Sequence, residues 1–165
     1  MRAEAPTVAY ASPVTAIRRA EVADAALVGR LLHDFNAEFG EPTPGAEALA
    51  ERAVAFIARG ELTFLLAGEG PDGIAQLRFL PWLWSEGLDA RLEELYVVPE
   101  RRGRGIGRAL LEAAMETTRT AGATHIELNT GETDTVARAL YESAGFTNRE
   151  GDPDGPSMLY YEREL

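Results

Sequence analysis

The chain has no cysteine and only two histidines among its 165 residues. It therefore has no disulfide, no thiolate nucleophile and no cysteine-based metal site, and two isolated histidines do not supply the ligands of a zinc centre. No apolar run approaches the ~18 residues of a membrane span, and the first residues lack the apolar stretch of a signal peptide. We therefore expect a cytoplasmic protein that binds no metal and no membrane.

Positive charge is also scarce, with 16 basic against 27 acidic residues and a net charge of −11. Such a charge repels nucleic acid and anionic lipid and attracts cations. The three arginines in 101–104 do not offset it, so we expect no nucleic-acid partner. The charge favours an amine ligand, although ordinary solubility is the simpler explanation of it.

The apolar residues follow regular patterns that predict a mixed α/β fold. The length suits one domain, which we expect over 16–165, preceded by a flexible arm over 1–15. A 3.6-residue period predicts about four helices, the first with Asp24 as its N-cap, over 24–39, 46–59, 106–122 and 134–144. Short apolar runs predict a central mixed sheet of six to seven strands, over 15–20, 62–67, 74–80, 92–98, 125–129, 146–149 and 158–162.

The stretch from Leu92 to Gly122 has the pattern of a strand, a glycine turn and a helix. The free N–H groups of the first helical turn carry the positive end of the helix dipole, and glycine lets a phosphate approach the backbone. This arrangement predicts an anion site over 103–108. A P-loop is excluded because Gly107 is not followed by Lys and Ser or Thr. A dinucleotide fingerprint is excluded because Arg108 or Leu110 stands where its last glycine belongs.

Two segments resemble signatures of the GNAT superfamily of N-acetyltransferases. Residues Arg102 to Gly107, Arg-Gly-Arg-Gly-Ile-Gly, are similar to its R/Q-x-x-G-x-G/A signature, and Ala137 to Phe146 resembles its A-x-x-L-Y-x-x-x-G-F pattern. The resemblance implies the GNAT fold and transfer of the acetyl group of acetyl-CoA to a primary amine of a small molecule or peptide. Because no cysteine is available for a covalent relay, we expect direct attack in a ternary complex. The alternative is a GNAT-fold module that binds CoA and senses or interacts without turnover.

The resemblance also implies which residues hold acetyl-CoA. Main-chain groups of the central strand would bind the pantetheine and the acetyl carbonyl, and the glycine turn would bind the pyrophosphate between two arginines. Asn129 would contribute through its backbone, and Asp134 stands where many members carry asparagine, although it also suits the N-cap of the last helix. The implied cofactor contacts are Leu95, Tyr96, Val97, Val98, Arg102, Gly103, Arg104, Gly105, Ile106, Gly107, Arg108, Asn129 and Asp134.

The catalytic candidates are a tyrosine and a pair of acids. Tyr141 matches the family tyrosine that points at the CoA sulfur, which implies that it protonates the leaving thiolate, with a core role as the alternative. Glu93 and Glu94 are adjacent in a strand, so strand parity places them on opposite faces and only one serves the acetyl group. A similar acidic pair in diamine acetyltransferases of the superfamily implies that Glu93 is the base.

The acceptor site is the least constrained by the signatures. In this fold it is lined by the loop between the first two helices and by strands opposite the cofactor, where aromatics beside an acid suit an organic cation. The alternative places the phenylalanines in the core and the tryptophans at a contact between two copies, since homodimers are common in the superfamily. The candidate substrate residues are Phe35, Glu38, Trp84 and Glu94.

Overall fold

The structure is a computed structural model that describes residues 15–69, 72–84 and 86–165. Residues 1–14, most of the predicted arm, lie outside the described residues. The described chain forms four α-helices, α1 (Ala25–Glu38), α2 (Ala46–Arg59), α3 (Ile106–Thr120) and α4 (Thr135–Ser143), and two 3₁₀ turns, η1 (Val22–Asp24) and η2 (Pro99–Arg101). Its strands are β1 (Ile17–Arg19), β2 (Thr63–Ala67), β3 (Gly73–Pro81), β4 (Leu88–Val97) and β5 (Ala123–Glu127).

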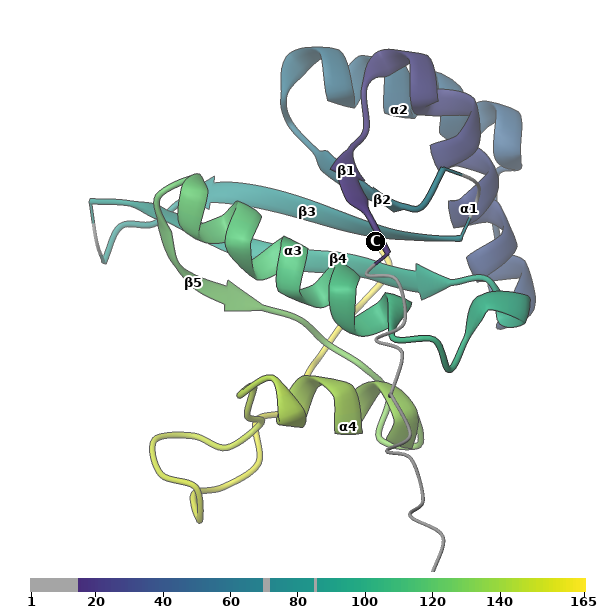
Figure 1. Cartoon of the computed structure of the whole chain (residues 1–165). Coiled ribbons are helices and arrows are strands. Elements are labelled where there is room, and N and C mark those ends of the chain that lie inside the picture. The colour runs from purple at the N-terminus through teal and green to yellow at the C-terminus, as the bar shows by residue number, and fades with distance from the viewer. Residues whose placement is uncertain (1–14, 70–71, 85) are drawn as a thin grey trace, which may run out of the picture.

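The strands form one sheet in the order β1-β2-β3-β4-β5. The first four strands pair antiparallel, whereas β4 and β5 are parallel and are connected through α3. Figure 1 shows α3 lying along the sheet, with α4 beyond the β4 and β5 side of the sheet. A hairpin turn joins the long strands β3 and β4, and the other end of β4 leads through η2 to the glycine turn.

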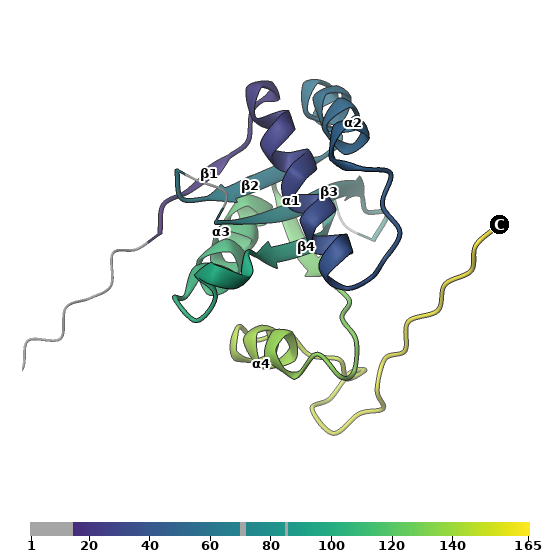
Figure 2. The same cartoon turned by 90° about the vertical axis from the view of Figure 1, so that its right-hand side faces the viewer.

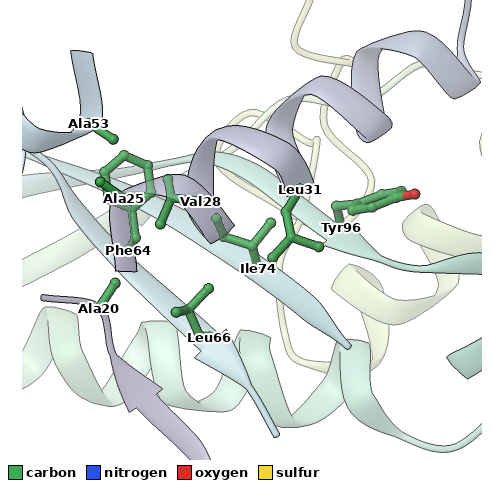
Figure 3. Close-up of a cluster of buried hydrophobic side chains, with 9 residues drawn as sticks. All are labelled: Ala20, Ala25, Val28, Leu31, Ala53, Phe64, Leu66, Ile74 and Tyr96. Carbon is green, nitrogen blue, oxygen red and sulfur yellow. The ribbon is translucent and has the colours of Figure 1, made fainter. Parts of the chain in front are cut away.

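The sheet buries a separate apolar cluster on each face. One cluster joins α1 and α2 to alternate residues of the strands, including Phe64, Ile74 and Tyr96. Figure 3 shows that the Tyr96 ring lies at the edge of this cluster, with its hydroxyl pointing away from the other side chains. The other cluster packs Leu110 and further residues of α3 against Leu77 and its neighbours on the opposite face. Figure 2 shows α3 and α1 on different sides of the sheet.

The predicted α/β class and the four helices are confirmed, but the expected strand count is wrong. The segment 146–149 makes one isolated bridge, from Arg149 to Ser157, and the described segment 158–162 forms no strand or bridge. Leu159 and Tyr161 remain 71% and 83% exposed, so this segment buries too little apolar surface to stabilise a strand. Five strands therefore form the sheet of the described residues.

Asp24 does not cap α1 as predicted. Its carboxylate accepts hydrogen bonds from the Glu21 N–H and from the guanidinium of Arg18, and it makes no cap bond to α1. The reason is the short turn η1, which precedes α1 and uses Asp24 as its last residue.

Among the described residues, no helix combines the length and apolarity that a membrane span needs.

Gly29 allows α1 and α2 to pack closely. A Cβ at this position would lie 2.4 Å from the Ala46 carbonyl oxygen and 2.6 Å from the Ala50 nitrogen, both backbone atoms of α2. The two helices must therefore separate if any side chain is added here.

We predict that Gly29→Ala lowers the free energy of unfolding by about 1–3 kcal/mol because it overpacks this contact. Helix propensity alone predicts the opposite sign, a gain of about 1 kcal/mol. Urea denaturation measures the difference. Gly107→Ala is the control, because its Cβ would meet Leu140 at an ordinary 3.6 Å. A stabilised Gly29→Ala variant would show that the helices do not touch here.

Candidate active site

The two parallel strands of the sheet separate beside the predicted anion site. Their pairing runs from Leu88 and Ala123 to Arg91 and Glu127, where β5 ends. β4 continues to Val97, so within the described chain its residues 92–97 pair only with β3. One edge of β4 is therefore open over six residues, which is where the sequence predicts main-chain contacts to a thioester arm.

A β-bulge in β4 orients the acidic pair. Gln76 pairs with Glu94 and Leu77 pairs with Leu92, so Glu93 is an extra residue without a partner on β3. Gln76 lies two residues from Ile74, which is in the cluster under α1, so Glu94 faces the same side.

Glu93 points to that side as well, because it contacts Arg78, which follows Gln76 on the same face of β3. The prediction that Glu93 and Glu94 lie on opposite faces is therefore wrong. The inserted residue breaks the alternation between them.

Glu93 is held by two arginines. Its Oε1 lies 2.6 Å from Nη2 of Arg78, and its Oε2 lies 3.2 Å from Nε of Arg91. Both oxygens are thus engaged by cations. This arrangement does not suit the predicted role of Glu93 as the base.

Glu94 has the character of a base that works near neutral pH. Burial, with a smaller contribution from the charge of Glu93, raises the pKa of Glu94 to about 7. Among the described residues, no hydrogen-bond or ion-pair partner holds its carboxylate. Glu94, which the sequence analysis gives as a substrate residue, therefore suits the role of proton acceptor better than Glu93 does.

Tyr141 lies on α4 within electrostatic range of Glu94. Burial raises the pKa of Tyr141 to about 12, and the charges of Asp134 and Glu94 contribute in the same direction. The ring packs edge-on against Phe146, at 6.1 Å between centroids, and borders the cluster under α3. The phenol is therefore neutral at physiological pH and is available as a hydrogen-bond donor.

Asp134 has the structural role that the sequence offered as an alternative. Its Oδ1 accepts a 3.0 Å hydrogen bond from the Ala137 N–H, so it caps the N-terminus of α4. Helix α4 also lies close to the anion site, because a Cβ at Gly107 would touch both Leu140 and Val97. The cap thus fixes the helix that presents Tyr141.

The glycine turn has the geometry expected of an anion cradle. Gly103 and Gly105 have φ angles of +72° and +79°, and a Cβ at either position would meet no atom within 4 Å. No side chain caps α3, and its first internal hydrogen bond is from Ala109 N–H to the Gly105 carbonyl. The N–H groups of 106–108 therefore lack an acceptor within the helix. Ile106 supplies only its backbone here, because its side chain is buried.

The three arginines near the glycine turn differ in their side-chain partners. Arg102 turns to the α1 side, where Nη2 lies 2.7 Å from Glu38, Nε donates to the Val97 carbonyl, and the guanidinium lies 5.8 Å from the Tyr96 ring centroid. Arg108 donates to Ser143 on α4. Arg104 is exposed and makes no ion pair within the described chain. The side chains of Arg102 and Arg108 thus have partners within the protein, and the predicted cofactor contacts of both residues stay predictions.

The Val97 carbonyl accepts from Arg102, and the Val98 N–H donates to the Asp72 carbonyl. These two predicted cofactor contacts are therefore engaged within the protein. Asn129 follows the end of β5 and accepts a hydrogen bond from Arg91 through its side chain. Its backbone contact to a cofactor stays a prediction.

The predicted substrate residues separate into two groups. Phe35 stacks on Tyr96, with centroids 5.1 Å apart, and Glu38 binds Arg102, so both lie at the C-terminal end of β4. Trp84 lies in the turn between β3 and β4, 86% exposed, at the opposite end. Six residues of strand, about 20 Å, separate that turn from Glu94.

The structure therefore does not bring Trp84 to the site of its own chain. The helical and strand patterns do not fix which loop lies beside which strand end. A contact between two copies at Trp84 stays a prediction.

Arg78 and Arg91 are site residues that sequence reasoning missed. The predicted central strand begins at Leu92, so Arg91 is outside it, although β4 begins four residues earlier. The alternation of Asp89, Ala90, Arg91 and Leu92 is the signal that could have extended the strand.

Comparison with known proteins identifies the family of the chain. Residues 29–146 match the sequence profile of the Acetyltransferase (GNAT) family. This chain belongs to the GNAT family. A GNAT relative, the uncharacterized N-acetyltransferase YhfO of Bacillus subtilis, is 30% identical over 82% of this chain and 91% of its own length.

A partial sequence match and a match to a solved structure agree with membership of this family. A mycothiol acetyltransferase of Thermobispora bispora is 46% identical over 38% of this chain, but the match covers only 22% of that protein. A crystal structure of a protein described as an acetyltransferase, from Arthrobacter sp. FB24, is 49% identical with a TM-score of 0.85. That comparison covers 94% of this GNAT chain and 99% of the Arthrobacter chain.

We predict that Glu94→Gln is more stable than the wild type above pH 7, by on the order of 2 kcal/mol. The native pKa of Glu94 is raised, so between about pH 4.5 and 7 the native state binds more protons than the unfolded state. Stability therefore falls as pH rises through this window, and glutamine removes that loss. Urea denaturation from pH 4 to 8 measures it.

Glu93→Gln is the matched control and has the opposite expectation. It removes the partner of two arginines, so it lowers stability at neutral pH. If Glu94→Gln followed the wild-type pH dependence, Glu94 would not be a buried carboxyl of raised pKa.

Proposed function

We propose that this chain transfers the acetyl group of acetyl-CoA to a primary amine of a small molecule or peptide. The proposal includes direct attack within a ternary complex. The observation that supports it is the open edge of β4 beside the glycine turn and the uncapped first turn of α3, with Glu94 on this strand and Tyr141 on α4. The sequence offers no cysteine for a covalent alternative.

The residues present fit acetyl-CoA. The glycine turn and the uncapped first turn of α3 would hold its pyrophosphate, with Arg104 beside them. The open edge of β4 over 92–96 would hold the pantetheine arm and the acetyl carbonyl through main-chain groups. Bound there, acetyl-CoA supplies a thioester that an amine attacks directly.

The two titratable side chains take complementary roles. Glu94 accepts the proton that an incoming ammonium must lose, directly or through a water. A base with a pKa near 7 is better matched to this task than an ordinary carboxylate near ~4.3. Tyr141 donates its phenolic hydrogen to the departing sulfur, which needs a neutral phenol. Glu93 stays an ion-paired neighbour that orients the arginines.

We predict that Tyr141→Phe and Glu94→Gln each lower kcat by about 10²-fold or more, because each removes one proton-transfer group. Thiol release from acetyl-CoA with a panel of amines is the measurement. CoA affinity should stay within about twofold of the wild type, which shows that the loss is chemical. Glu93→Gln is the comparison variant, and a larger loss in it than in Glu94→Gln would return the base to Glu93. Saturable CoA binding without thiol release from any amine would favour a binding module over an enzyme.

We predict that Arg104→Gln weakens CoA binding about tenfold, since it removes a charge-assisted contact to phosphate. Arg102→Gln should change CoA affinity less and thermal stability more, because Arg102 links the turn to Glu38 on α1. Isothermal titration with CoA and thermal unfolding separate the two effects. A greater loss of CoA affinity in Arg102→Gln would contradict this assignment.

A further inference from the structure

A cavity of about 320 Å³ opens beside the acidic pair on the face of the sheet opposite α3. Its volume is at the small end of the range for small-molecule sites. Its wall combines side chains from the end of α2 and from the loop before β2 with polar residues of β3 and β4. The lining residues are Phe56, Glu61, Leu62, Gln76, Arg78 and Glu93.

Gln76 joins this cavity to the proposed reaction centre. Gln76 lines it and is the register partner of Glu94. Arg78 is two residues farther along the same strand and on the same face, about 7 Å away. A molecule with its amine at Glu94 therefore extends over Gln76 towards Arg78.

Both acidic side chains of the cavity wall already form ion pairs with arginines. Glu61 is paired with Arg59 through both oxygens, at 2.7 and 2.9 Å. Glu93 lies between two guanidinium groups. Neither acid is left to bind a second cation.

Arg78 differs from the other arginine that holds Glu93. Arg91 also binds Glu127 and Asn129, so all three of its nitrogens are used. Arg78 contacts Glu93 through one nitrogen, and in the described chain it has no further partner. Its side chain is 45% exposed. A guanidinium has five N–H donors, so Arg78 keeps donors for a second acceptor.

We propose that the acceptor is a small amine that also carries a carboxylate, with the amine at Glu94 and the carboxylate on Arg78. This inference rests on the proposed acetyl transfer to an amine. Arginine binds carboxylates through parallel N–H bonds and repels a second ammonium group. Glu94 and Arg78 lie one strand across and two residues along from each other, roughly 8 Å apart. The site thus selects ω-amino acids or short peptides that span about this distance between amine and carboxylate, and it disfavours polyamines.

The test uses matched acceptors that differ only in this charge. Each ω-amino acid from 3-aminopropanoate to 6-aminohexanoate is compared with its own primary amide, and putrescine represents the diamines. Thiol release from acetyl-CoA gives kcat/KM for each. We expect the wild type to favour the acids about tenfold or more, mainly through KM, with the largest preference among the longer ones.

Arg78→Met should abolish the preference by lowering kcat/KM for the acids while leaving the amides nearly unchanged. Arg78→Lys keeps the charge without the fork, so an intermediate preference is expected, and it serves as the second variant if Arg78→Met does not fold. The control is Arg119→Met on α3, which removes an exposed arginine on the other side of the sheet and should keep the full preference.

The outcomes of this test distinguish a failure of the carboxylate inference from a failure of the proposed acetyl transfer. Equal rates for acids and amides, a preference for putrescine, or an unchanged preference in the Arg78 variants would overturn the inference while acetyl transfer stands. No thiol release with any amine would overturn the proposed function itself, and the inference with it.

Discussion

Between Leu92 and Glu94, β4 carries one residue more than the β3 segment it pairs with, and the candidate site depends on this insertion. Glu94 faces the α1 side through its pairing with Gln76, and regular alternation would turn the neighbouring Glu93 to the opposite face. With the insertion, both carboxylates face the same side, next to the open edge where β5 has ended. The bulge thus places two acids together at the only stretch of β4 in the described chain that lacks a second strand partner.

Two adjacent acids on one face repel each other, and the structure resolves this repulsion by treating them differently. Arg78 and Arg91 form ion pairs with Glu93, while burial and the charge of Glu93 raise the pKa of Glu94. A pair of carboxylates in different environments can perform different tasks. The arginines that stabilise Glu93 also change the character of the neighbouring cavity, from an acidic surface suited to polyamines to one that can accept a carboxylate.

Local sequence signals predicted the parts of the site that local backbone geometry determines. The glycines at 103 and 105 are required by positive φ angles, and the helices end within a residue or two of their expected bounds. The second signature correctly located Tyr141 on a helix.

The misses concern features that depend on distant partners. Nothing in Glu93-Glu94 reveals a bulge, because it exists only relative to the length of β3. The contact of Arg102 with Glu38 was not predicted, because the two residues are 64 positions apart in sequence and only the fold brings them together. Trp84 was predicted at the substrate site but lies in the turn between β3 and β4, because composition alone does not tell which end of the two strands lies near the site. The strands predicted over 146–149 and 158–162 do not form, because an alternating pattern of side chains does not ensure that the fold offers an apolar surface for them to pack against.

The most direct test of this account is a ¹³C NMR titration of the Glu93 and Glu94 carboxyl groups in the wild-type chain, assigned with the two Glu→Gln variants. The account predicts that the Glu94 carboxyl titrates at about pH 7, and that Glu94→Gln removes this transition while Glu93→Gln shifts it downward, because a neighbouring negative charge is lost. A Glu94 carboxyl that titrates near ~4.3, as in a solvated peptide, would contradict the placement of Glu94 as the buried base.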